Sequence, residues 1–403
     1  MKKCISIILS LVLAFGHVHY IARADVDEQQ YLKNYIYEYM NFLDSSLSEL
    51  VLDREEALKY YESEDSLDYV YLDALIQHRK MQMSDLKYES ISNVIDIQSI
   101  EKKDDVYNVE VVKESIMKYN CMDGEISEEI EFHDLIIEKK AETFIIVCDE
   151  NYDEMKHDLG ITVNEDICDV KAKVSTALSK EKDFIAQEKI KLEQVQEKGY
   201  LETEEIEKEV NNNETGVEIK ASSFTKHSYN RSAAKTYALK YVLSPNSKYA
   251  NFEKDGGNCT NFTSQCLYAG GIKKDKTGNY KWYYESVNDR APAWTSANHF
   301  RNYYKNNVGS SSIKGLNAKS CKFEATRLGD LAQKVVSGKA KHTMFISGYL
   351  ADNWASDNPW KYKYDVTICQ NSTSKSGRLK NVPLSSRYSL SSLEYIHING
   401  CYY

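Results

Sequence analysis

The chain has 403 residues and a formal net charge of −10 at pH 7, and 42% of its residues are hydrophobic. This length is too great for one ordinary hydrophobic core and predicts two domains or more. No recognisable nucleic-acid-binding motif accompanies the basic stretches, which argues against a nucleic acid as partner. Beyond the N-terminus, no segment approaches the roughly 18 consecutive apolar residues that a membrane-spanning helix needs.

Residues 1–24 have the pattern of a secretory signal peptide. Lys2 and Lys3 precede the apolar run CISIILSLVLAFG, and the small-x-small triplet ARA ends the segment at residues 22–24. Cleavage there would begin the mature protein at Asp25. We therefore expect a protein that is secreted, extracellular or associated with the cell surface, with no stable membrane span after cleavage. An uncleaved anchor is the alternative interpretation.

Residues 25–168 are expected to form a small α+β domain. Up to about residue 85, apolar and tyrosine side chains recur every three or four positions, which is typical of amphipathic helices. Four strand-like segments follow, SNVIDIQSI, VYNVEVVKESIMKY, EIEFHDLIIEK and ETFIIVCDE, separated by charged turns. The pattern predicts one or two helices and then about four antiparallel strands. The domain has no convincing catalytic cluster, and we expect its His133 to be an ordinary surface or core residue. The role of this domain stays unknown.

Residues 169–225 are dense in lysine and glutamate and poor in large apolar side chains. Such a composition without proline predicts an exposed, charged helical linker that frays at the asparagines of residues 211–213. A solvated spacer is its simplest role. The linker would lead into a second domain, residues 226–403.

The two parts of the mature chain carry opposite charge. Residues 25–225 hold 22 Lys and Arg against 50 Asp and Glu, a net charge of −28, whereas residues 226–403 hold 26 against 11, a net charge of +15. The basic part could face an anionic cell-wall polymer or dock on the acidic part, because opposite charges attract over roughly 8 Å at physiological salt. Such docking could restrain or chaperone the basic part. An adaptor for surface attachment is the plainer alternative.

The stretch GGNCTNFTSQCLYAGG, residues 256–271, places a cysteine directly behind two glycines and an asparagine. Apolar spacing after Cys259 predicts a short helix that stops at the second glycine pair. Unpaired N–H groups and the positive end of the helix dipole stabilise a thiolate at a first turn, which makes Cys259 a candidate nucleophile. Its backbone N–H could also stabilise an oxyanion, helped by Asn258 or Tyr249. Cys266 lies on the apolar side and is expected in the core.

A cysteine nucleophile needs a base, and His342 is the best placed candidate. It opens the strand-like run HTMFISGYL, and a second run, YKYDVTICQN, ends at Asn371. If the two runs pair as a hairpin around a centre near residue 357, His342 lies opposite residue 371 or 372. The Asn371 amide could then hold the imidazole in one tautomer. The alternatives are His299 or His397 as base and Gln370 or Asp365 as third member.

Eight cysteines remain after the predicted cleavage, at positions 121, 148, 168, 259, 266, 321, 369 and 401. Their spacing shows no paired pattern, so no disulfide is predicted. Neither CxxC nor HExxH metal spacing occurs, and thiol catalysis requires no metal or organic cofactor.

Six blocks of the second domain follow one another in a characteristic order: YNRSAAKTYALKYVL, YANFEKDGGNCTNFTSQCLYAGGI, KWYY, APAWT, LGDLAQ and HTMFI. They resemble the bacterial putative amidase domain family, a papain-like group, over about residues 226–385. The resemblance implies a Cys-His amidase or peptidase on a papain-like α+β fold, with Cys259 as nucleophile and His342 as base. The family usually has an acidic residue at the position of Asn258 and a histidine in the block that reads QNS here, at residues 370–372.

The sequence thus predicts a secreted hydrolase, a cysteine amidase or peptidase. Its substrate would be a peptide or amide bond, with cell-wall peptidoglycan fitting the compartment and the basic catalytic domain. Glycosylation acceptor triplets start at Asn258, Asn261 and Asn371, and because glycans there would obstruct the site, they favour a bacterial source. The rival interpretation is a non-catalytic wall-polymer-binding protein that keeps the amidase fold.

Overall fold

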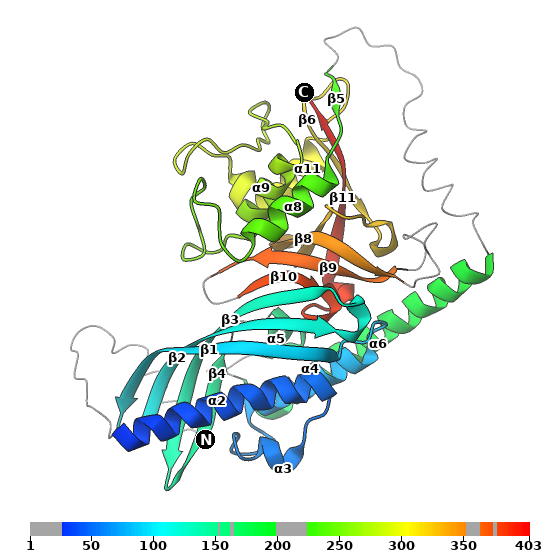
Figure 1. Ribbon diagram of the computed structural model, residues 1–403. Coiled ribbons are helices and arrows are strands. Elements are labelled where there is room, and N and C mark those ends of the chain that lie inside the picture. The colour runs from blue at the N-terminus through cyan, green and yellow to red at the C-terminus, as the bar shows by residue number, and fades with distance from the viewer. Residues whose placement is uncertain (1–25, 152–153, 162–164, 199–223, 352–362, 374–376) are drawn as a thin grey trace.

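The computed structural model describes residues 26–151, 154–161, 165–198, 224–351, 363–373 and 377–403 (Figure 1). The predicted signal peptide, residues 199–223 of the predicted linker and the predicted hairpin loop at 352–362 lie outside these ranges. Within them, no helix combines the length and the apolar character that crossing a membrane requires. We call the described residues before 199 the N-terminal half and those after 223 the C-terminal half.

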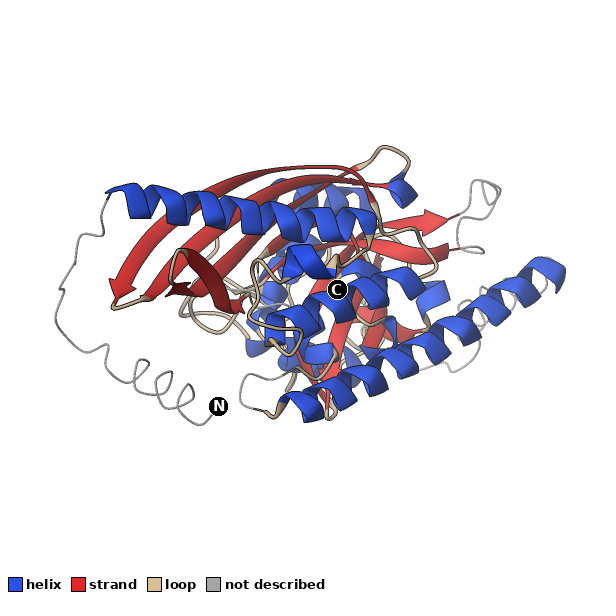
Figure 2. Cartoon of the chain, turned by 90° about the horizontal axis from the view of Figure 1, so that it is seen from below, coloured by secondary structure: helices blue, strands red, loops and turns tan. Residues whose placement is uncertain are grey.

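The N-terminal half is a layer of helices on an antiparallel sheet. Its elements are α2 (Val26–Glu49), α3 (Arg54–Ala57), α4 (Leu67–Met81), β1 (Tyr88–Lys103), β2 (Val106–Tyr119), the short turn η1 (Asn120–Met122), β3 (Ile126–Lys140), β4 (Thr143–Glu150), α5 (Glu154–Asp158) and α6 (Ile167–Lys198). α2 lies along the strands, as Figure 1 shows from the side and Figure 2 from below. Alternate residues of β2 are buried against this layer, because successive side chains of a strand point to opposite faces.

The C-terminal half packs helices on the continuation of the sheet. Its elements are β5 (Lys226–His227), α8 (Arg231–Tyr241), α9 (Cys259–Ala269), α10 (Pro292–Thr295), α11 (Ala297–Asn306), β6 (Gly315–Cys321), η2 (Phe323–Ala325), β7 (Leu331–Val336), β8 (Lys339–Ala351), β9 (Lys363–Asn371), β10 (Arg378–Pro383), η4 (Leu384–Ser386), η5 (Leu390–Ser392) and β11 (Leu393–Tyr402). Its core contains Phe262 and Cys266 of α9 with the buried rings of Trp282 and Trp294. The mixed helices and antiparallel strands of both halves agree with the predicted α+β class.

One sheet runs through both halves. Its strand order is β1-β2-β3-β10-β9-β8-β7-β11-β5, with β4 on β3 and β6 on β11. The halves meet where β10 pairs antiparallel with β3, with Arg378 opposite Ile130 and Lys380 opposite Glu128. β4 covers only residues 134–140 of the same edge of β3, which leaves the preceding residues for β10. The domain boundaries taken from the sequence stay a prediction. The hydrogen-bonded pair of β3 and β10 makes the sheet continuous between the two halves.

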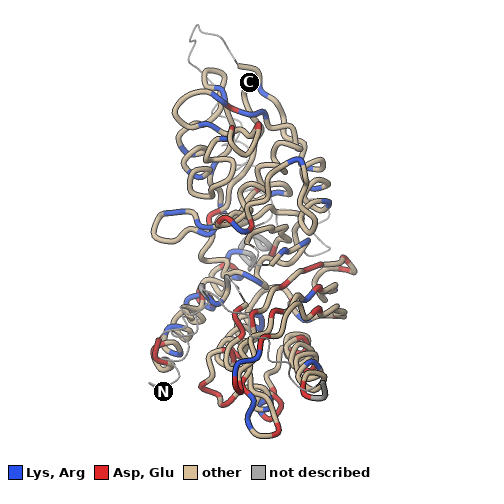
Figure 3. Tube along the Cα trace, turned by 90° about the vertical axis from the view of Figure 1, so that its left-hand side faces the viewer, with Lys and Arg blue, Asp and Glu red and all other residues tan. Residues whose placement is uncertain are grey.

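Packing and charge also join the halves. A hydrophobic cluster combines Tyr88, Met117 and Tyr119 with Met344 and Ile368 of the C-terminal half. Within the described residues, three ion pairs cross between the halves, and in each the carboxylate comes from the N-terminal half; they are Glu128–Lys380, Glu129–Arg387 and Asp158–Lys334. Figure 3 shows acidic positions concentrated in the lower, N-terminal half and mainly basic positions above.

α6 is a long helix at the start of the predicted linker, and its first part is packed rather than solvated. Val170, Val174 and Leu178 form a buried stripe four residues apart that packs with α4. Farther along, Glu181 is buried and accepts a hydrogen bond from the Leu390 N–H at 3.1 Å. The density of lysine and glutamate hides this stripe in the sequence, because charged residues outnumber the large apolar ones along α6.

The junction of β3 and β10 gives a first prediction. Gly377 precedes β10 with φ of 68°, and a Cβ there would lie 2.5 Å from the Ile130 carbonyl oxygen of β3. Gly338 has a similar φ of 75° but open space around it. We expect Gly338→Ala to cost about 1 kcal/mol for its left-handed backbone, and Gly377→Ala to cost clearly more because the strands must also separate. Urea unfolding midpoints measure both, and equal midpoints would contradict the prediction.

Candidate active site

Cys259 is the first residue of α9, where the sequence predicts a helix start, and the loop before it fixes its place. Gly256 and Gly257 have φ angles of 97° and 121°, which residues with side chains rarely adopt. The Asn258 N–H donates to the Ser372 carbonyl at 2.9 Å, so the loop rests on the end of β9. Cys259 is 8% exposed. The candidate nucleophile therefore begins a buried helix beside the sheet.

Asn258 and Asn371 tie this loop to the strand. The Asn258 Oδ1 accepts from the Asn261 Nδ2 at 2.7 Å, and the Asn258 Nδ2 donates to the Asn371 Oδ1 at 2.9 Å. The Asn371 Nδ2 donates to the Val242 carbonyl at 2.9 Å. The side chain of Asn371 thus bonds Asn258 and the end of α8, and the predicted bond from Asn371 to His342 is not formed among the described residues.

His342 faces Ser372 across the pair of β8 and β9. Phe345 lies opposite Cys369, and the same register places His342 opposite residue 372, one of the two positions that hairpin symmetry predicts. The Ser372 Oγ lies 3.4 Å from the His342 Nδ1. Because neighbouring strand residues point to opposite faces, Ser372 and Asn371 cannot both turn toward the imidazole. The structure places Ser372, and not Asn371, beside the imidazole. This shift of one residue moves the neighbouring side chain to the other face of the strand.

His342 lowers the pKa of the Cys259 thiol more than any other group beside it. Burial alone raises the pKa of the Cys259 thiol, but the charge of His342 and a hydrogen bond with its side chain outweigh this, and the pKa lies below its ordinary value. The Thr260 hydroxyl, 3.7 Å from the Cys259 Sγ, and the Thr343 backbone act in the same direction. On the same helix, burial holds the pKa of Cys266 well above its ordinary range. The two cysteines of α9 therefore differ, because the pKa of Cys259 is lowered and that of Cys266 is raised.

Three polar residues beside Cys259 and His342 have no role predicted from the sequence. The Thr260 and Thr343 hydroxyls lie 3.1 Å apart, and the Gln333 Nε2 donates to the Thr343 Oγ1 at 2.9 Å. Gln333 stands opposite Thr343 in the pairing of β7 with β8. The two threonines directly follow Cys259 and His342 in the sequence, and this adjacency is the feature from which their place near the site could be predicted. This chain of hydrogen bonds links the start of α9 to two strands and fixes the helix relative to His342.

The alternative bases lie elsewhere. His397 of β11 is buried against Asp330, with 2.8 Å between the Nδ1 and the Oδ2. His299 of α11 lies 3.0 Å from the Ser296 Oγ. These two side chains therefore have partners of their own outside the Cys259 pair.

The remaining candidates are also held by other groups. Asp365 is buried, which raises its pKa to about 6, and it accepts from the Ser385 hydroxyl at 2.5 Å. The Gln370 Oε1 accepts from the Tyr388 hydroxyl. Tyr249, an oxyanion candidate, packs its ring on Trp294, with centroids 6.1 Å apart. The oxyanion roles of Asn258 and Tyr249 stay predictions.

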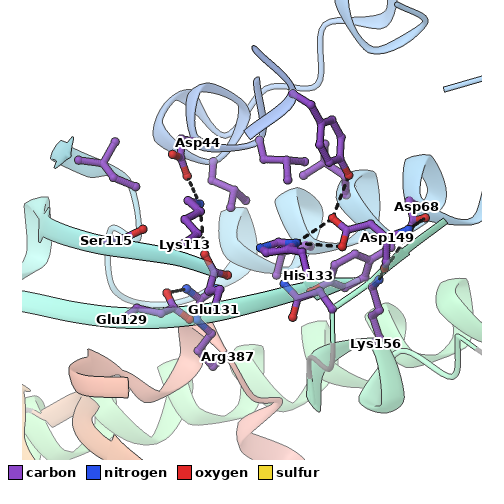
Figure 4. Close-up of a pocket in the computed structure, with 18 of the residues that line it drawn as sticks. Asp44, Asp68, Lys113, Ser115, Glu129, Glu131, His133, Asp149, Lys156 and Arg387 are labelled. Carbon is purple, nitrogen blue, oxygen red and sulfur yellow. Dashed lines mark hydrogen bonds and ion pairs between the residues drawn. The ribbon is translucent and has the colours of Figure 1, made fainter. Parts of the chain in front are cut away.

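A cavity of about 60 Å³ lies between α2, α4 and the sheet, and Arg387 of the C-terminal half also lines it (Figure 4); Cys259 is not among its lining residues. Its walls carry buried charges in pairs, including Lys113 with Asp44 at 2.5 Å and His133 with Asp149 at 2.9 Å. His133 is a core residue, as the sequence allows. A cavity of this size and polarity has room for a few ordered waters. Within the described residues, no group of three or more His, Cys, Asp or Glu side chains is placed to hold a metal ion.

A comparison with known protein families matches most of the C-terminal half. Residues 228–379 match the family model described as a putative amidase domain. No curated protein and no solved structure matches the chain. The match suggests an amidase-type hydrolase, and both Cys259 and His342 lie inside the matched residues.

Proposed function

We propose that the protein is a cysteine-dependent amidase or peptidase in which Cys259 is the nucleophile and His342 the base. The observation that carries the proposal is the lowered pKa of the Cys259 thiol at the start of α9, caused by His342 on β8. A thiolate beside an imidazolium is the reactive form of such a pair. The amidase domain match supports the same class of reaction.

In the proposed reaction, the Cys259 thiolate attacks the carbonyl carbon of an amide. The C–N bond then breaks, and the His342 imidazolium gives its proton to the leaving amine, which leaves a thioester on Cys259. Water, deprotonated by His342, attacks the thioester and releases the acid and the thiol. The Cys259 N–H at the helix start would stabilise both oxyanions. Ser372, beside the His342 Nδ1, takes the orienting place that the sequence assigns to Asn371.

The substrate class and the compartment are part of the proposal. A secreted, bacterial, cell-surface protein with a basic catalytic half would meet peptidoglycan, whose peptide stems offer amide bonds. The signal-peptide pattern of residues 1–24 and the net charge of +15 over residues 226–403 support this choice. Purified peptidoglycan and generic peptides, digested by the protein and analysed by mass, would identify the bond that is cut.

Thiol reactivity against pH tests the mechanism directly. We expect iodoacetamide to modify Cys259 well below pH 8, because a lowered pKa leaves the thiolate present at pH values where an ordinary thiol is protonated. Cys168 is an internal control, since it is exposed and nearby Asp166 raises its pKa. Peptide masses follow both sites in one sample. If Cys259 reacts at no lower pH than Cys168, the non-catalytic wall-polymer-binding alternative is favoured.

A further inference from the structure

The segment between β10 and β11 brings the N-terminal half to the catalytic base. Tyr388 in this segment stacks on the His342 ring, with centroids 6.1 Å apart and an interplanar angle of 14°. The Tyr388 hydroxyl donates to the Gln370 Oε1. The next residue toward the N-terminus, Arg387, forms an ion pair with Glu129 of β3, seen at the lower left of Figure 4. Adjacent residues of one segment thus contact His342 and the N-terminal half.

Further elements of the N-terminal half hold the same segment. The His78 Nε2 of α4 lies 2.8 Å from the Ser385 carbonyl oxygen. Glu181 of α6 accepts from the Leu390 N–H at 3.1 Å. These bonds attach the segment to two helices in addition to β3. The position of the ring stacked on His342 is therefore set by residues far from it in the sequence.

Asp158 of α5 reaches still closer to the site through Lys334. Lys334 stands directly opposite His342 in the pairing of β7 with β8, so their side chains share one face of the sheet. The Lys334 Nζ lies 2.8 Å from the Asp158 Oδ1, and these side chains are only 2% and 6% exposed. A buried ammonium is costly without a counter-charge. The N-terminal half thus supplies a counter-charge, Asp158, to a cation beside the candidate base.

This pairing has a consequence for the thiolate. Among the described residues, the ionisable groups that lie beside His342 include Cys259 of α9, Lys334 of β7 and Tyr388, and Asp158 places a negative charge next to Lys334. Without the carboxylate, the positive charge of Lys334 would oppose protonation of His342. Less imidazolium means less stabilisation of the Cys259 thiolate.

We propose that the N-terminal half is a working part of the catalytic site, and that Asp158 acts as a positioning residue that balances the charge of Lys334 beside His342. This rests on the proposed function, since it concerns the same Cys-His pair. The acidic half then assists the site, in contrast to the restraint that its opposite charge first suggests.

The test measures iodoacetamide modification of Cys259 against pH in the full chain. Asp158→Asn keeps the shape of the side chain and an oxygen for the Ser389 N–H, which is 3.3 Å away in the wild type. We expect this variant to shift the Cys259 profile upward by about one pH unit. Asp105→Asn, which removes the same charge from the exposed turn between β1 and β2, should leave the profile in place. Adding Lys334→Met to Asp158→Asn should restore the profile, because both charges of the pair are then absent.

The results in these variants support or overturn the proposed role of Asp158. An unshifted profile in Asp158→Asn would overturn the proposal, as would a shift of the same size in Asp105→Asn. A shift that persists in the double variant would also overturn it, because the cause would then be altered packing and not the Lys334 charge. If the wild-type Cys259 itself reacts at no lower pH than Cys168, the proposed function fails first, and this proposal fails with it.

Discussion

Cys259→Ala is expected to abolish amide hydrolysis, with turnover lowered about a thousandfold or more. The side chain supplies the only atom that bonds to substrate in the proposed reaction, and alanine leaves His342 with no thiol to deprotonate. The variant should fold, because removing one sulfur atom from a small side chain at the start of α9 leaves the Asn258 to Asn371 bond and the Thr260 to Thr343 contact intact. Product masses from peptide and peptidoglycan digests measure the loss.

Cys266→Ala is the matched control, since Cys266 lies on the same helix but packs in the hydrophobic core. We expect this variant to lose some stability through the small cavity and to keep turnover at a temperature where it is folded. Iodoacetamide should inactivate the wild type and Cys266→Ala alike. Turnover that survives Cys259→Ala would exclude the thiol mechanism.

Arg387→Met is expected to lower the free energy of unfolding by about 3–5 kcal/mol. Arg387 and Glu129 form an ion pair across the two halves, and both residues are buried. Methionine fills part of the space but leaves the Glu129 carboxylate in the protein interior without the guanidinium, and the desolvation cost of that charge then falls on the folded state. Unfolding in urea, followed by circular dichroism, measures the change in midpoint.

Arg54→Met provides the comparison for this loss. Arg54 pairs with Glu64 on the surface, where both side chains are largely exposed, with relative accessibilities of 66% and 47%. Water solvates these charges whether or not they are paired, so we expect no measurable change in the urea midpoint. Equal effects of the two substitutions would show that burial at the junction of the halves does not set the strength of the Arg387 pair.

The local features of the candidate site could be predicted from the sequence. Two glycines and an asparagine before Cys259 indicate a turn, and the apolar spacing after it indicates a helix, so the thiol at the first turn follows from a few neighbouring residues. The strands that contain His342 and Asn371 were likewise indicated by their alternation, and the symmetry of the loop between them gave a pairing of residue 342 with 371 or 372. The structure has His342 opposite residue 372.

The choice between those two residues required the tertiary structure. A register change of one residue turns a side chain to the other face of a strand, and the sequence alone does not fix that register. Asn371 therefore bonds Asn258, while Ser372 lies beside His342. The residues from other strands, Gln333 and Lys334, were equally out of reach, because their proximity to the site depends on the pairing of β7 with β8.

The sequence by itself determined the α+β class, the helix that begins at Cys259 and the strand that contains His342, because each depends on residues close together in the chain. Only the tertiary structure decided that β3 pairs with β10, that α6 packs its buried stripe on α4, and that Asp158 reaches Lys334. These contacts join residues about a hundred or more positions apart, and hydrophobic periodicity has no information about which distant surfaces meet. The opposite net charges of the two halves predict attraction between them. The structure shows the ion pairs through which this attraction acts, Glu128–Lys380, Glu129–Arg387 and Asp158–Lys334.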